Sequence, residues 1–319
     1  MTFAVCSVVA GLVLLFLGAE VMIRGAVALS RGLKVSPHVI GLTVIAFGTS
    51  APELFVSMKA ALSGAPAIAV GNVVGSNLAN ILLMIGTVGV IAPIACASPN
   101  LRREGAALVA ATALFAGASV TGHIGPLLGA AMVAALIGYL LLCYRMDLAQ
   151  GDNSVFAREA AEFDEHSLSL PRAAAQTVGG IVAVVIGARL LVDGAVVVAA
   201  AAGVSQAVIG ITLVAFGTSL PELATTLVAA LRRHGDVALA NIIGSNIFNT
   251  LGITGAVAAV AGLPIPPSIV AVELWLMVAV TVAFVAITLT CARIPRPLAV
   301  LCFLLYAAII GAQFLGGAP

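Results

Sequence analysis

The amino-acid sequence predicts an all-α membrane protein of ten transmembrane helices, arranged as two inverted-topology repeats of five helices each. Three observations support this fold class: the composition, an internal duplication, and the distribution of Lys and Arg. The chain has 319 residues, of which 62% are hydrophobic and 8% charged, and its mean hydropathy is +1.20. Soluble domains carry about 25% charged residues, so the composition excludes a soluble protein.

Apolar runs long enough to cross a hydrocarbon core of about 30 Å recur along the chain. Because backbone exposed to lipid must satisfy its own hydrogen bonds, we expect these runs to be helices. The first run lacks a basic leader and continues past Glu20, so we expect a transmembrane span there and not a signal peptide. The expected spans are residues 3–30, 36–62, 66–93, 104–121, 124–144, 172–201, 205–231, 237–262, 269–291 and 298–316.

An internal duplication relates the two halves of the chain. A shift of 169 positions superimposes Gly18–Asn80 on Gly187–Asn249 without a gap, and Ser36–Phe55 shares 13 of 20 residues with Ser205–Ala224. The expected division is a first five-helix repeat at 1–144, a polar linker at 145–171, and a second five-helix repeat at 172–319. Because five is odd, the second repeat must enter the membrane from the opposite side, as in many secondary transporters.

Lys and Arg give the orientation. Placing the N-terminus outside leaves eleven of the 14 basic residues in cytoplasmic connections, which is a clear positive-inside bias. We therefore expect a multi-pass protein of the cell (inner) membrane with both termini outside and linker 145–171 in the cytoplasm. The eleven residues are Arg31, Lys34, Arg102, Arg103, Arg145, Arg158, Arg172, Arg232, Arg233, Arg293 and Arg296.

The duplicated segment places polar groups inside an apolar run. Thr49, Ser50 and Glu53 share one face of a helix, and Pro52 removes a backbone donor and frees carbonyls in the preceding turn. The motif therefore predicts a broken helix on which carbonyls, hydroxyls and a carboxylate converge. The second half repeats it with Thr218, Ser219, Pro221 and Glu222.

A second duplicated block adds amides and hydroxyls. It reads GNVVGSNLAN at 71–80 and ANIIGSNIFN at 240–249, which supplies Ser76, Asn80, Ser245 and Asn249. Together with the two carboxylates these are hard oxygen ligands, which suit Ca²⁺ and Na⁺. An unpaired carboxylate in the membrane is costly, so Glu53 and Glu222 are expected to be ligands. Packing or inter-helix hydrogen bonding is the expected role of Asn72, Asn77, Asn241 and Asn246.

The remaining polar residues are expected to have structural roles and not to bind ions. Glu20–Arg24 and Arg189–Asp193 occupy equivalent positions with reversed charge order, which favours structural ion pairs. The five cysteines form no CxxC pair and the four histidines do not cluster, so a transition-metal site is not expected. Three other acidic residues lie near span ends and are expected to be solvated: Glu104, Asp236 and Glu273.

The two motifs, GTS-x-PE and GSN-x-x-N, resemble the α-repeats of the cation/calcium exchanger superfamily, and most of all its prokaryotic sodium/calcium exchanger branch. The resemblance covers both repeats, and only the linker lies outside it. It implies two tilted helices packed across a core of eight, with four cation sites at mid-membrane. It also implies a ligand set beyond the two glutamates: the carbonyls of Thr49, Thr218, Ala46 and Ala215, and the side chains of Ser50, Ser219, Ser76, Ser245, Asn80 and Asn249.

The resemblance implies a transport activity but leaves its coupling ion open. Some relatives, potassium-dependent ones among them, carry Asp where this chain has Asn249, so potassium transport is not favoured. Proton-coupled relatives usually carry a glutamate in the second block, and its absence favours sodium. We expect electrogenic exchange of sodium for calcium by alternating access, with three sodium ions per calcium implied by the family and calcium extruded.

Two alternatives stay open at this point. One is a calcium/proton antiporter, and the other, from a different class, is a cation channel. An enzyme is not expected, because neither an HExxH nor a GxSxG motif is present. The expected partners are calcium and sodium ions and the lipid bilayer. No prosthetic cofactor, nucleic acid or protein partner is implied.

Overall fold

The computed structural model describes residues 1–92, 94–96, 100–150, 168–202 and 215–316. The described part is almost entirely helical. Its strands are β1 (His123–Ile124) and β2 (Leu263–Pro264), which pair antiparallel, with His123 opposite Pro264. The expectation of a mostly helical membrane protein is therefore confirmed.

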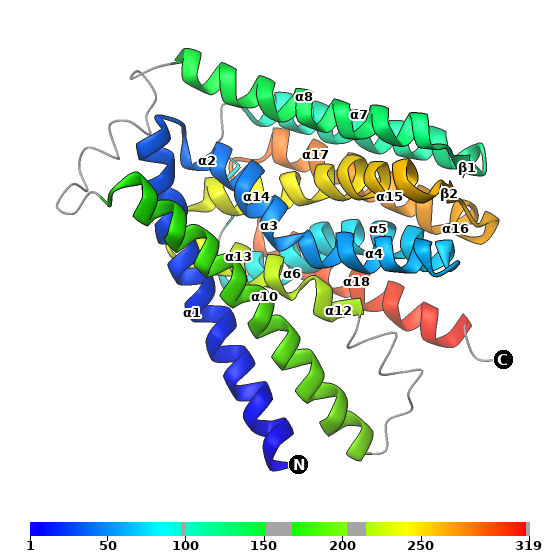
Figure 1. The fold of residues 1–319 in the computed structure, drawn as a ribbon, viewed down its shortest axis with the longest axis horizontal. Helices are drawn as coiled ribbons and strands as arrows, with labels where there is room; N and C mark the ends of the chain where they lie inside the picture. The colour runs from blue at the N-terminus through cyan, green and yellow to red at the C-terminus, as the bar shows by residue number, and fades with distance from the viewer. Residues whose placement is uncertain (93, 97–99, 151–167, 203–214, 317–319) are drawn as a thin grey trace.

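Helices α1 (Thr2–Leu33) and α10 (Leu170–Ala201) run side by side at an angle to the other long helices (Figure 1). Glycines bring their backbones together. A β-carbon added at Gly11 would lie 2.5 Å from the backbone N of Leu191, and one added at Gly180 would lie 2.5 Å from the backbone N of Met22. Small residues permit this close approach between membrane helices. The glycine seam, as we call this contact, contains Gly11, Gly18, Gly25, Gly180, Gly187 and Gly194.

The first GTS-x-PE motif lies on a broken helix. Its parts are α2 (Pro37–Ile40), the π-helical turn η1 (Gly41–Ile45), α3 (Ala46–Thr49) and α4 (Ala51–Leu62), with a bend of 43° between the segments Pro37–Thr49 and Ala51–Leu62. Pro52 lies in the first turn of α4, where its missing N–H costs no helical hydrogen bond.

The second motif is broken at the equivalent residue. Helices α12 (Ala215–Thr218) and α13 (Leu220–Leu231) meet at Ser219, whose φ and ψ are −87° and 0°. At Ser50 the corresponding angles are −85° and 5°. Residues 205–214 of the expected seventh span lie outside the described residues.

Two interrupted helices form the core. One consists of α5 (Pro66–Leu78), η2 (Ala79–Leu83) and α6 (Met84–Ile91), and the other of α14 (Gly235–Ile247), η5 (Phe248–Ile253) and α15 (Thr254–Ala261). In their most apolar windows 78% and 89% of the residues are buried, against 28% and 22% in α1 and α10. Their π-helical turns disturb the regular hydrogen-bond ladder, a feature that often marks functional positions.

The remaining helices surround this core: α7 (Leu101–Val120), α8 (Pro126–Gln150), α16 (Pro267–Ala271), α17 (Glu273–Thr290) and α18 (Arg296–Gly316). Figure 1 shows α7 and α8 along one side of the molecule. Residues 145–150, expected in the linker, belong to α8. There Asp147 accepts hydrogen bonds from the backbone N and Oγ of Ser36, at 2.6 and 3.0 Å, and so holds the start of α2.

Six helices in the described residues are long and apolar enough to cross a membrane, or seven if the bent pair Pro37–Thr49 and Ala51–Leu62 counts as one span. The expected number of ten remains a prediction. Shorter apolar helices, Leu220–Leu231 and Arg296–Ala312, overlap two of the other expected spans.

Candidate ion-binding site

Two buried carboxylates lie at the two helix breaks. Glu53 is in the first turn of α4 and Glu222 in the first turn of α13, and their exposed fractions are 1% and 0%. Each carboxylate turns back towards its own backbone N–H, at the helix end where negative charge is favoured. Within the described residues neither pairs with Lys, Arg or His, and Oε2 of each lacks a hydrogen-bond partner.

The two halves of the chain meet at these carboxylates. Ser50 Oγ, at the break in the first half, donates a hydrogen bond of 2.8 Å to Oε1 of Glu222 in the second half. Ser50 lies three residues before Glu53, so this bond connects the two helix breaks. A cation bound beside the two carboxylates would stabilise the ionised form of both.

The equivalent bond in the other direction is absent from the described part of the chain. Ser219 corresponds to Ser50, but its Oγ is buried without a partner, and Oε2 of Glu53 is also unpartnered. The site is therefore asymmetric although its residues are duplicated.

The π-helical turns contribute amides to the same region. Asn80 lies in η2 and Asn249 in η5, each with 1% exposure, and none of their four side-chain N and O atoms has a partner among the described residues. Ser245 Oγ is likewise buried and unpartnered, while Ser76 is buried with 5% exposure. Buried polar groups are hydrogen-bonded in the great majority of cases, so this concentration of unpartnered oxygens fits a site for hard cations.

The main-chain groups expected as ligands lie at the same breaks. Thr49 is the last residue of α3, and its Oγ1 donates to Ile45 O at 3.1 Å. The carbonyl of Ala46 accepts the Ser50 N–H at 3.1 Å and also lies 3.4 Å from Thr49 Oγ1. Thr218 is half-buried and engages a partner, and Ala215 begins α12, but its side chain is outside the described residues.

A cation bound by the two carboxylates would need further oxygen ligands to complete its coordination shell. Within the described part of the chain no group of three or more His, Cys, Asp and Glu side chains is placed to hold a metal. The two carboxylates therefore need the hydroxyl, amide and carbonyl oxygens of the broken and π-helical turns, a mixture that Ca²⁺ accepts.

Two of the asparagines expected to serve in packing or inter-helix hydrogen bonds contact the glutamate-bearing turns. Asn72 Nδ2 donates to Glu53 O at 3.2 Å and to Ser57 Oγ at 2.9 Å. In the second half, Asn241 Nδ2 donates to Glu222 O at 3.5 Å and to Thr226 Oγ at 3.0 Å. The signal in the sequence was the equal separation of 19 residues between each glutamate and its asparagine.

The expectation that Glu104 is solvated is wrong. Its exposure is 0%, and its Oε2 lies 2.7 Å from Nε2 of buried His38. His38 Nδ1 lies 3.1 Å from the carbonyl of Asp236, so this nitrogen carries a hydrogen. A hydrogen bond at the other nitrogen then requires one more proton, on His38 or on Glu104. Asp236 and Glu273 are half-buried, so they are only partly solvated.

The expected structural ion pairs are present. Arg24 Nε and Glu20 Oε1 are 2.6 Å apart, and Arg189 Nε and Asp193 Oδ2 are 3.8 Å apart at the surface. Glu20 also binds Arg232, with 2.6 Å between Nη2 and Oε1.

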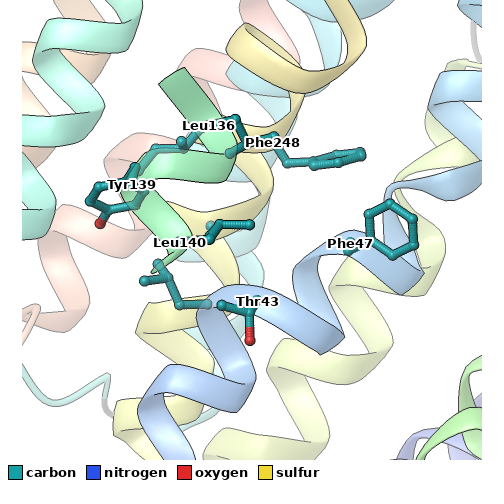
Figure 2. Close-up of a pocket in the computed structure, with 9 residues that line it drawn as sticks. Thr43, Phe47, Leu136, Tyr139, Leu140 and Phe248 are labelled. Carbon is teal, nitrogen blue, oxygen red and sulfur yellow. The ribbon is translucent and has the colours of Figure 1, made fainter. Parts of the chain in front are cut away.

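A small pocket with a mostly apolar lining lies beside the site. Figure 2 shows Thr43 and Phe47 on one wall, Leu136, Tyr139 and Leu140 of α8 on another, and Phe248 of η5 between them. The rings of Phe47 and Phe248 pack edge to face, 5.2 Å apart at an interplanar angle of 83°. The apolar lining is unsuited to ions, and none of the unpartnered oxygens of the site belongs to it.

The chain was compared with known proteins. A family model described as sodium/calcium exchanger protein matches residues 3–145 and 172–315. The chain is 38% identical over 319 residues to a protein named putative antiporter CaxA from Alkalimonas amylolytica, covering 99% of both. It is 31% identical to sodium/calcium exchanger MaX1 from Methanosarcina acetivorans, covering 88% of both.

Solved structures of a sodium-calcium exchanger, NCX_Mj, are also similar. One of them, soaked with 10 mM Na⁺ and zero Ca²⁺, superimposes with a TM-score of 0.80 at 31% identity. The match covers 98% of this chain and 99% of that structure. The fold therefore matches that of NCX_Mj over nearly the whole length.

Proposed function

The chain belongs to the sodium/calcium exchanger protein family, and from this premise we propose that it exchanges sodium ions for calcium across the membrane. It is a transporter of the cation/calcium antiporter type, as the family and the NCX_Mj neighbours support. The observation that carries the specific proposal is the pair of buried carboxylates, one from each half, each with an Oε2 that lacks a hydrogen-bond partner among the described residues. Catalysis of a chemical reaction has no role in this proposal.

The coupling follows from shared ligands. Two carboxylates neutralise one Ca²⁺, or they hold sodium ions in overlapping sites, but they do not hold both full sets at once. Calcium therefore leaves before sodium completes its sites. If three sodium ions replace one calcium, each cycle moves one net charge, so the exchange is electrogenic and the membrane potential contributes to calcium extrusion.

The proposed ligand set extends beyond the two carboxylates. Ser50, Ser219 and the carbonyls of Thr49 and Thr218 line the centre. The peripheral positions fall to Ser76, Ser245 and the carbonyls of Ala46 and Ala215, while Asn80 and Asn249 flank the middle. The unpartnered state of Ser219, Ser245, Asn80 and Asn249 supports this assignment.

The proposed architecture is ten transmembrane helices in two inverted repeats that alternate between inward and outward opening. Three features support it. The breaks occur at Ser50 and Ser219, 169 positions apart, and π-helical turns begin at Ala79 and Phe248, also 169 apart. The same family model matches each half separately. The proposed setting is the inner membrane, with both termini outside and linker 145–171 in the cytoplasm.

The coupling ion is the point that an experiment must decide. The name of the relative CaxA specifies an antiporter without an ion, and a calcium/proton antiporter is the alternative. We expect purified protein in vesicles to take up radioactive calcium when sodium is loaded inside and absent outside. Proton or potassium gradients alone should give no uptake. Uptake that follows a pH gradient without sodium would assign the alternative function, and unitary currents in a planar bilayer would indicate a channel.

A further inference from the structure

Asn72 and Asn241 bind corresponding pairs of groups in the two halves of the molecule. In each half the side-chain amide of the asparagine donates one hydrogen to the glutamate's backbone carbonyl and the other to a hydroxyl four residues later on the same helix. Both hydrogens of each amide are thereby used. The contact is made twice, by residues 169 positions apart, so it is not an accident of one local packing arrangement.

Each turn that these amides hold directly follows a break in its helix. Ser50 and Ser219 interrupt the helices immediately before the glutamates, and Pro52 and Pro221 remove a backbone donor at each break. Main-chain hydrogen bonds from Leu54 N to Ser50 O and from Leu223 N to Ser219 O connect each first turn to its break. The asparagine amide adds an anchor on a neighbouring helix.

The anchors lie on the same helix faces as other proposed ligands. Asn72, Ser76 and Asn80 are spaced by four residues along α5 and η2, so they follow one face. The same spacing relates Asn241, Ser245 and Asn249 on α14 and η5. Each amide therefore fixes the distance between a glutamate on one helix and the serine and asparagine on the next.

We propose that Asn72 and Asn241 are positioning residues: they set the separation between Glu53 or Glu222 and the ligands of α5 or α14 without binding an ion themselves. The inference rests on the proposed function, because it concerns the same site. Residues that hold metal ligands in place typically influence metal affinity by 10–100-fold. Their loss should therefore weaken ion binding more than it slows transport at saturating calcium.

The first test compares Asn72→Ala and Asn241→Ala with the unmodified protein in vesicles. Each substitution should raise the calcium concentration for half-maximal exchange by about 10-fold, with the maximal rate nearly unchanged. Ser57→Ala and Thr226→Val should shift the half-maximal concentration in the same direction by less. Thr225→Val is the matched control for Thr226→Val. Thr225 is as buried as Thr226, but its hydroxyl bonds to Pro221 O within α13 and not to an asparagine.

A second variant gives a readout that a merely structural residue would not affect. In Asn72→Asp, the introduced carboxyl group faces the backbone carbonyl of Glu53. It repels that carbonyl when ionised and donates a hydrogen bond to it only when protonated. Calcium affinity relative to the unmodified protein at the same pH should therefore recover as pH is lowered. Asn72→Ala should show no such recovery, because alanine has no group to protonate.

The outcomes separate this proposal from the proposed function. Calcium binding to the purified protein, measured by calorimetry, reports on positioning even if exchange is driven by an ion other than sodium. Weaker binding in Asn241→Ala supports the positioning role in either case. Unchanged half-maximal concentrations and binding, or a lower maximal rate with unchanged affinity, would overturn it. If Asn72→Ala does not fold, Asn72→Asp and Ser57→Ala decide the question by the same measurements.

Discussion

Helices α4 and α13 carry the same motif at equivalent positions, yet they are packed differently. In α13 nine of the 12 residues are buried, whereas in α4 only Glu53 and Ser57 are. Phe55 is 75% exposed, and its counterpart Ala224 is 7% exposed. The carboxylate of the buried helix accepts a hydrogen bond from Ser50, and Ser219 does not return the equivalent bond to Glu53.

This difference shows that duplication supplies equal ligands to both halves without giving them equal surroundings. Asymmetry of this kind is required of a transporter whose site opens to one side of the membrane at a time, because its two halves cannot adopt the same conformation together. Four comparisons between equivalent residues test how far this asymmetry extends.

The largest effect should come from the carboxylates, where the two halves are equal. Glu53→Gln and Glu222→Gln should each reduce sodium-driven calcium uptake in vesicles to the level of protein-free vesicles, because one remaining charge does not neutralise Ca²⁺. Asp193→Asn is the matched control: its carboxylate is 68% exposed and belongs to a surface ion pair. Retained uptake in either glutamine variant would remove that carboxylate from the mechanism.

The next comparison concerns Glu104 and Glu273, which are 169 positions apart. Glu104 is paired with buried His38, whereas Oε2 of Glu273 has no partner among the described residues. Removing one partner of a buried hydrogen bond leaves the other group unsatisfied and costs about 1–3 kcal/mol, and more where that group is charged. His38→Ala should therefore lower the free energy of unfolding in detergent by that amount, and Glu273→Gln should leave it nearly unchanged.

The control for His38→Ala is the double variant His38→Ala, Glu104→Leu, which also removes the Glu104 carboxyl group, whose remaining ion-pair partner is Arg103 Nη2 at 3.6 Å. It should recover part of the lost stability, because apolar replacements of buried ion pairs are often neutral. An equal loss in His38→Ala and Glu273→Gln would contradict the difference between the halves.

The serines test the asymmetry directly. Ser50→Ala removes the donor to buried Glu222 and should lower the free energy of unfolding by about 1–3 kcal/mol. Ser219→Ala removes a hydroxyl without a partner in the described residues, so we expect little change. Denaturation of both variants in sodium- and calcium-free detergent would measure this. Equal losses would mean that the Ser219 hydroxyl is as strongly bonded as that of Ser50.

The smallest effects belong to the surface ion pairs. Asp193→Asn should cost well below about 1 kcal/mol, because exposed pairs contribute little. Glu20→Gln should cost slightly more, since Glu20 binds both Arg24 and Arg232 and is only 18% exposed. Ion selectivity should be unchanged in both variants, and competition of calcium uptake by other divalent cations would reveal any change.

The sequence predicted which polar side chains are buried better than it predicted how they are packed. Equal offsets between duplicated residues identified Glu53, Glu222, Asn80 and Asn249 as ligand candidates, because a buried carboxylate or amide needs a partner. The proposed roles of these residues still await the experiments above. Composition also predicted a helical membrane protein, which the structure confirms.

Features that depend on contacts distant in the sequence were not predictable in this way. Glu104 lies near the start of its helix, where acids are usually solvated, and its partner His38 is 66 residues away. The roles of Asn72 and Asn241 required knowing which helix packs against each glutamate-bearing turn. The different burial of α4 and α13 could not follow from two nearly identical motifs.

The glycine seam between α1 and α10 has a consequence for how the molecule is assembled. Shifting each residue number by 169 converts the contact of Gly11 with Leu191 into that of Gly180 with Met22. Such a self-complementary surface is what two copies of one polypeptide form around a dyad. The seam thus has the form of a homodimer interface within a single chain. The covalent connection between the two halves then serves mainly to raise their effective concentration, and adds little to their affinity for each other. Two halves expressed as separate chains should therefore associate through this surface.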